Sequence, residues 1–84
     1  MQIEKIKVRL TSTGQQIDVT VFSKRAEAIE VVVGEGVHSV RCMLTPTRNG
    51  LAYAGNVRGR EIVYERSRAQ VEAEVKREAD LRRR

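Results

Sequence analysis

The residues best suited to chemistry in this 84-residue chain are its single histidine and single cysteine, His38 and Cys42. An imidazole beside a thiol can form a pair of base and nucleophile, because a thiol needs a neighbouring base to react at neutral pH. We expect both residues on one strand, four positions and roughly 13 Å apart, which is too far for a hydrogen bond. We therefore interpret His38 as a partly polar buried residue and Cys42 as an unreactive core thiol, and we predict no catalytic residue.

A second chemical candidate is the glycine-containing segment 33–39, which begins like a dinucleotide-binding loop at Gly34 and Gly36. The place of the third glycine is taken by Ser39, and the residues that follow alternate like a strand instead of opening a helix. We interpret the segment as a hairpin turn. One His and one Cys also cannot supply the four ligands of a structural zinc site, so we expect no metal, no cofactor and no enzymatic activity.

Basic residues are the remaining chemical signal, since 16 Lys and Arg against 11 Asp and Glu give a net charge of +5. This charge favours an anionic partner, and an arginine can donate two hydrogen bonds to one phosphate. We predict a cationic, partly apolar surface that docks on nucleic acid or on a nucleoprotein complex, on the side of the sheet that the helix leaves uncovered. Its donors would be Lys5, Lys7, Arg9, Arg41, Arg48, Arg58 and Arg60.

The competing interpretation of these cations is a solvated face of mixed charge. Asp18, Glu30 and Glu61 fall on the same expected surface, and the aromatic residues on which single-stranded nucleic acid would stack are missing. A steep loss of affinity with salt would separate the two interpretations.

The elements that must position these side chains are short strands. Apolar residues alternate with polar ones over 3–10 and again over 16–22, with a turn between them, which predicts a hairpin. Turn residues recur up to position 64 and favour an antiparallel meander of five or six strands. The expected strands are 3–10, 16–22, 28–33, 37–44, 51–54 and 60–64.

Two segments in the middle of the chain need a closer interpretation. Residues 24–32 also fit helical spacing, but their β-branched side chains lose freedom in a helix, so we favour the strand 28–33. Asn49-Gly50 indicates a hairpin turn with positive φ angles after Pro46. The predicted fold is a small α+β domain, and the alternative is a small barrel of the same strands.

The periodicity changes after Tyr64. Ser67 and Gln70 have the spacing of a capping box that begins a helix over 68–82. We expect one domain, 1–84, with the sheet in 1–64 and the helix in 67–84. The apolar stripe of that helix is thin, so the helix either contacts the sheet shallowly or projects and pairs with a second copy. We predict a homodimer through Val71 and Val75.

Some apolar residues fall out of phase with the core-facing positions, among them Phe22, Val32, Met43 and Val63. Apolar residues mixed with arginine are typical of protein interfaces. The alternative function is therefore a protein-binding adaptor or inhibitor, of the kind that phages and plasmids carry against host defence complexes. Its interface would use Phe22, Met43, Val63, Val71 and Val75.

The longest apolar run, residues 31–33, is far shorter than the roughly 20 residues that span a bilayer. The charged beginning of the sequence lacks the apolar core of a secretion signal. We expect a soluble, cytoplasmic protein with no membrane partner.

Overall fold

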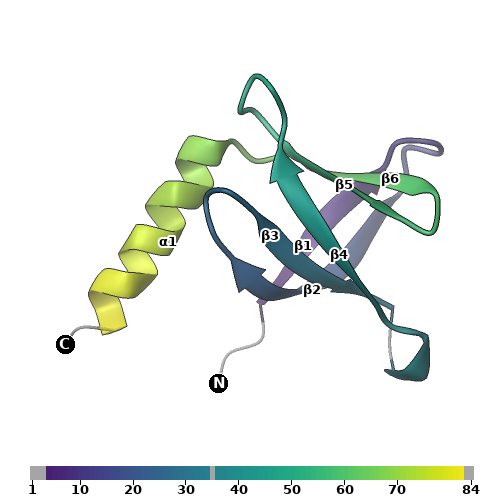
Figure 1. Ribbon diagram of the computed structural model, residues 1–84, viewed down its shortest axis with the longest axis horizontal. Coiled ribbons are helices and arrows are strands. Elements are labelled where there is room, and N and C mark those ends of the chain that lie inside the picture. Colours follow the sequence, from purple (N-terminus) through teal and green to yellow (C-terminus); the bar gives the residue numbers. More distant parts are fainter. Residues whose placement is uncertain (1–3, 35, 83–84) are drawn as a thin grey trace.

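The computed structural model describes residues 4–34 and 36–82, which form six antiparallel strands and one C-terminal helix (Figure 1). The sheet closes into a barrel in the order β1-β2-β3-β4-β5-β6, with β6 returning to β1. The α+β meander is confirmed, and the strands take the barrel form. The elements are β1 (Glu4–Leu10), β2 (Gln16–Lys24), β3 (Ile29–Val33), the 3-10 turn η1 (Gly36–His38), β4 (Val40–Pro46), β5 (Tyr53–Val57), β6 (Arg60–Tyr64) and α1 (Arg68–Arg82).

The core lies inside the barrel and is almost entirely aliphatic. Successive side chains of a strand point to opposite faces, so every second side chain points into the barrel. The register pairs Ile6 with Val19 across β1 and β2, and Val31 with Cys42 across β3 and β4. The buried set is Ile6, Val8, Leu10, Val19, Ile29, Val31, Cys42, Leu44, Tyr53, Ile62 and Val71.

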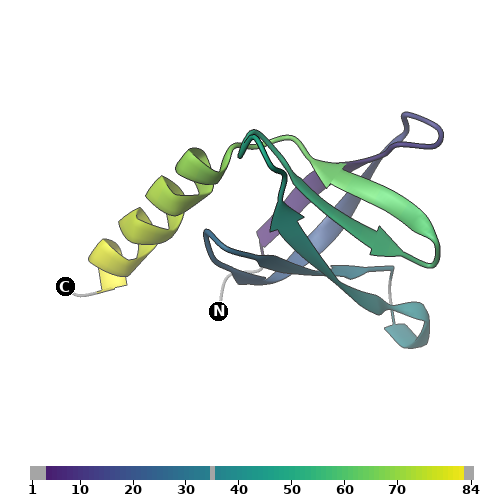
Figure 2. The same cartoon turned by 45° about the horizontal axis from the view of Figure 1, so that its top comes forward.

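One end of the barrel is filled by Tyr53 and by Val71 of α1, both fully buried. The Tyr53 hydroxyl donates a 2.6 Å hydrogen bond to the Ala26 carbonyl and so ties β5 to the β2–β3 connection. Figure 1 shows α1 on this side of the barrel, and Figure 2 shows the same arrangement after rotation. We call this end of the barrel, filled by Tyr53 and Val71, the closed end.

A β-bulge in β2 changes which side chains face the closed end. The register of β2 against β3 shifts between Val21 and Ser23, so Phe22 is the extra residue. Before the bulge the odd-numbered residues Val19 and Val21 face inward, whereas after it Lys24 pairs with the inward Ile29. The bulge therefore turns Phe22 outward and Lys24 toward α1.

The predicted helix is confirmed with its capping box. The Ser67 hydroxyl accepts from the Gln70 amide at 3.1 Å, and the Gln70 side chain accepts from the Ser67 amide at 3.0 Å. The thin apolar stripe has the predicted consequence, because Val71 is buried, Val75 half-buried, and Ala79 and Leu81 exposed. The later part of α1 thus projects from the barrel (Figure 1). Within the described residues, no helix is both long and apolar enough to cross a bilayer.

The structure confirms one prediction between β2 and β4 and corrects another. The favoured strand 28–33 is confirmed as β3 (Ile29–Val33), so the helical alternative for 24–32 is wrong. The strand predicted from residue 37 begins instead at Val40, because the chain first makes a 3-10 turn over Gly36–His38. Gly34 and Gly36 have positive φ angles of 89° and 58°, which glycine adopts readily. His38 is therefore an exposed turn residue, and not a buried strand residue.

The strand predicted at 51–54 is also displaced, because β5 spans Tyr53–Val57. The preceding loop covers residues 47–52 and is longer than a two-residue hairpin turn. Within it, the Asn49 side chain accepts hydrogen bonds from the Leu51 amide and the Thr47 hydroxyl. Gly55 lies inside β5, where a Cβ would stand 2.6 Å from the Met43 carbonyl oxygen. The close approach of β4 and β5 therefore requires glycine at this position.

Candidate functional site

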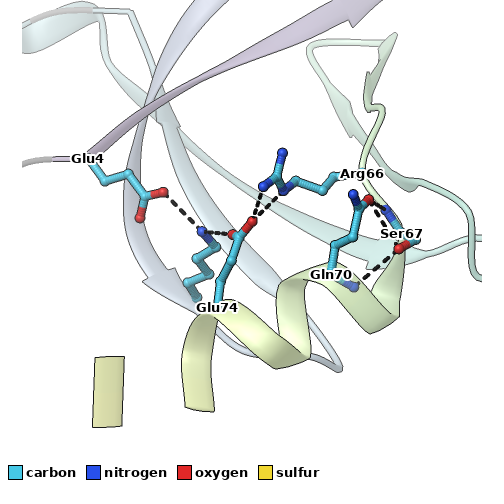
Figure 3. Close-up of polar contacts among 6 residues, drawn as sticks. Glu4, Arg66, Ser67, Gln70 and Glu74 are labelled. Carbon is cyan, nitrogen blue, oxygen red and sulfur yellow. Dashed lines mark hydrogen bonds and ion pairs between the residues drawn. The ribbon is translucent and has the colours of Figure 1, made fainter. Parts of the chain in front are cut away.

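A network of charged side chains holds α1 to the closed end (Figure 3). The Lys24 ammonium donates hydrogen bonds to Glu4 at 2.9 Å and to Glu74 of α1 at 2.6 Å. Arg66 also donates to Glu74. The Lys24 side chain is only 7% exposed, and these carboxylates satisfy its charge. This network fixes the helix. It also pairs two cations, Lys24 and Arg66, that could otherwise attract an anionic ligand.

The pKa values of this network follow from burial and pairing. Burial is the largest influence on the pKa of Lys24 and lowers it, but hydrogen bonds and charge from Glu74 and Glu4 outweigh burial, so the pKa is raised above 10.5. Burial raises the pKa of Glu74, yet the hydrogen bonds from Lys24 and Arg66 outweigh it and hold that pKa below 4.5. Lys24 and Glu74 are therefore both charged at neutral pH.

The seven predicted cations do not form one patch, because a closed barrel turns its outer surface in every direction. Lys5, Lys7 and Arg9 lie in a row along β1, and Arg9 forms an ion pair with Glu65 at 3.1 Å. Arg41 lies on β4, three strands from β1 in either direction around the barrel. Only the β1 row remains as a cationic surface of the expected kind.

The other three cations lie at the two ends of the barrel. Arg48 is in the β4–β5 loop, next to the closed end. Arg58 is in the turn between β5 and β6, and Arg60 begins β6 at the opposite end. Arg60 pairs with Val57 and shares its face with the buried Ile62, so its register places it on the inner face. Arg60 itself is exposed at this end of the barrel.

The outer face of β2, β3 and β4 carries a mixed apolar and charged surface, which we call the β2–β4 patch. Phe22 and Met43 are 57% and 52% exposed. Val32 pairs with Arg41, and Glu30 pairs with Met43, in the register of β3 and β4. The Arg41 guanidinium lies over the Phe22 ring and 3.6 Å from Glu30. The patch consists of Phe22, Glu30, Val32, Arg41 and Met43.

The remaining residues of the expected protein interface lie elsewhere. Val63 faces outward on β6, where it pairs with Arg9 and Ala54. Val71 is fully buried in the core of its own chain, and Val75 packs against that core. The expected dimer interface is corrected in this respect, because the Val71 side chain is occupied by the barrel and is not available to a second copy.

His38 and Cys42 do not share a site. His38 is exposed in η1, whereas the Cys42 thiol is buried and donates a 3.4 Å hydrogen bond to the Asn56 carbonyl. Burial also raises the pKa of the thiol and so keeps it protonated.

The end of the barrel opposite α1 is a feature that sequence reasoning missed, and we call it the open end. A hollow of about 450 Å³ lies there, between the β1–β2 turn, the β3–β4 connection and the β5–β6 turn. Its lining includes aliphatic side chains from five strands, together with His38, Arg58 and Arg60. The signal available in the sequence was an apolar residue in inward phase at the end of each of these strands.

The chain was compared with protein-family models, curated proteins and solved structures, and no match was found.

Proposed function

We propose that this chain is a non-catalytic binding protein that docks on another protein through the β2–β4 patch. The observation that carries the proposal is the pair of large apolar side chains, Phe22 and Met43, each more than half exposed on one wall of the barrel. Arg41 is stacked on the Phe22 ring. Phe, Met and Arg are enriched where proteins bind one another.

The chemistry of the patch also describes its partner. Phe22 and Met43 need an apolar surface to cover them, and a few such anchors supply most of the affinity of an interface. The net charge of +5 favours a partner with an acidic surface and opposes association with a second copy. An adaptor and an inhibitor would both use such a patch.

The test compares what the protein retains when its patch is altered. Three tagged proteins are used in pull-down experiments from extracts of the source cells. They are the unaltered chain, the double variant Phe22→Ser/Met43→Ser and the control Leu51→Ser. Leu51 is 65% exposed in the β4–β5 loop, so the control removes a comparable apolar side chain elsewhere. We expect a stoichiometric acidic protein with the unaltered chain and the control, and its loss with the double variant. Identical retention by all three proteins contradicts the proposal.

A second candidate function is nucleic-acid binding through the β1 row. Lys5 and Lys7 are exposed on one face of β1, and neither belongs to an ion pair with the described residues. Phosphate contacts of this kind weaken steeply with salt, because bound counterions are released. Fluorescence anisotropy with labelled RNA and DNA tests it, with Lys5→Gln/Lys7→Gln against the control Lys76→Gln on α1. Affinity that is equal at low and high salt, or unchanged in the β1 variant, eliminates this candidate.

A further inference from the structure

The two ends of the barrel differ in how their inward side chains are covered. At the closed end, Tyr53 and Val71 fill the interior. At the open end, each strand contributes one inward residue at or next to its terminus, and α1 lies on the other side of the barrel (Figure 1). These six residues are Leu10, Ile17, Val33, Val40, Val57 and Arg60.

The aliphatic members of this layer are incompletely covered. Leu10 is buried, but Ile17, Val33, Val40 and Val57 are only half-buried. They line the hollow of about 450 Å³, within the range of roughly 300–1,000 Å³ that is typical of small-molecule sites. Apolar side chains gathered in a concave surface at the mouth of a barrel are a common ligand-binding arrangement. The floor of the hollow suits a hydrocarbon group.

Two arginines stand at the rim of this floor. Arg60 occupies the inward position that the other five strands give to aliphatic residues. Arg58 lines the same hollow and donates a 3.3 Å hydrogen bond to the His38 carbonyl. Among the described residues, the lining contains no carboxylate. The rim is therefore suited to a negative charge.

The backbone of Arg58 adds an independent observation. Its φ angle of 52° lies in the left-handed region, which favours Gly or Asn and disfavours most other residues. With Gly59 at 77°, it forms the two-residue turn that joins β5 to β6. An arginine thus stands where the turn itself would prefer glycine, at the rim of an apolar hollow.

We propose that the open end binds a small amphipathic anion, namely an aliphatic carboxylate. The hydrocarbon chain lies against Val33, Val40 and Val57, and the carboxylate accepts hydrogen bonds from Arg58 and Arg60. A carboxylate is matched to the planar fork of arginine, which can donate two hydrogen bonds to it. This site is distinct from the β2–β4 patch and does not depend on it.

The test uses sodium octanoate as the probe and follows amide and methyl signals by NMR. We expect saturable shifts confined to the open end, and binding at least about tenfold weaker for 1-octanol, which lacks the charge. Arg60→Gln is expected to weaken octanoate binding about fivefold or more. The control Arg48→Gln, at the other end of the barrel, should leave it unchanged.

A second variant separates binding from folding. Arg58→Gly suits the left-handed turn, so its midpoint of urea unfolding should equal or exceed that of the unaltered protein, while octanoate binding weakens. Shifts that fail to saturate, that scatter over the cationic surface, or that persist equally in Arg60→Gln would overturn the proposal. Equal binding of octanol and octanoate would also overturn it, because the arginines would then have no role.

Discussion

The guanidinium carbon of Arg41 lies 4.2 Å from the centroid of the Phe22 ring, although the two residues come from β4 and β2 and β3 runs between them. Arg41 pairs in register with Val32 of β3, so its side chain extends across that strand to reach the ring. This contact holds two partly exposed side chains in a fixed relation. A partner would meet the β2–β4 patch already ordered, which reduces the entropy cost of binding.

The stacking should be measurable as a coupling energy. A double-mutant cycle of Phe22→Ala, Arg41→Ala and the double variant, followed by urea unfolding, is expected to give about 0.5–1 kcal/mol between the two side chains. Each single variant should otherwise affect stability little, because both residues lie on the surface. A coupling energy of zero would show that the patch is not ordered by this contact.

The network at the closed end predicts a strong effect of removing Glu74. Glu74→Gln leaves the nearly buried Lys24 with Glu4 alone, so we expect a loss of about 2 kcal/mol in the free energy of unfolding at pH 7. Glu72→Gln on the exposed face of α1 is the matched control and should change stability by less than about 0.5 kcal/mol.

The same pair predicts a pH dependence with a definite sign. The pKa of Glu74 in the folded protein is below its ordinary value of 4.5, so its contribution is complete above pH 4.5 and is lost as the pH falls through the folded pKa. The stability difference between unaltered protein and Glu74→Gln should therefore shrink below about pH 4.5. Unfolding curves collected from pH 7 to pH 3 measure it, and a constant difference would contradict the assignment.

The capping box predicts a cost for Ser67→Ala. The hydroxyl of Ser67 accepts a hydrogen bond from the Gln70 amide at the beginning of α1. Caps of this kind contribute about 1 kcal/mol to the free energy of unfolding. Ser12→Ala in the exposed β1–β2 turn is the control. Far-ultraviolet circular dichroism and urea unfolding should show the loss only for Ser67→Ala, and equal behaviour of the two variants would refute the cap.

Cys42 is expected to be structural and unreactive. The residue is 4% exposed and burial raises the pKa of its thiol, so a disulfide reagent should modify it slowly in the native protein and rapidly in denaturant. Cys42→Ala should lower stability by about 1 kcal/mol without affecting partner binding. Loss of binding by a correctly folded Cys42→Ala protein would give the thiol a function.

Local patterns were sufficient for the elements whose contacts are local. The hairpin of β1 and β2, the strand β6 and the helix with its Ser67–Gln70 cap follow from alternation and capping alone. The prediction failed where backbone conformation or side-chain hydrogen bonds intervened. The 3-10 turn moved His38 out of β4, and the Asn49 side chain lengthened the loop before β5.

The candidate sites depend on closure of the barrel, which no local pattern contains. A flat sheet would place the β1 cations and Arg41 on one face, whereas closure puts Lys7 and Arg41 on different walls of the barrel. Arg60 differs for another reason, because its register with Val57 gives it the phase of the buried Ile62. The β2–β4 patch was partly predictable, because Phe22 and Met43 are out of phase with the core. The bulge at Phe22, which directs Lys24 to Glu74, is a property of strand pairing that becomes evident only in the structure.

Gly55 has a consequence for how this chain can change in the course of evolution. A Cβ at that position would clash with the Met43 carbonyl oxygen and the Leu44 side chain. Substitution of Gly55 would therefore destabilise the fold. Phe22, Arg41 and Arg60 carry no such constraint, because they are exposed or at the rim. Among descendants of a common ancestor, glycine at 55 should persist even in lineages that have lost the binding partner, whereas the other three should be retained only under selection for recognition.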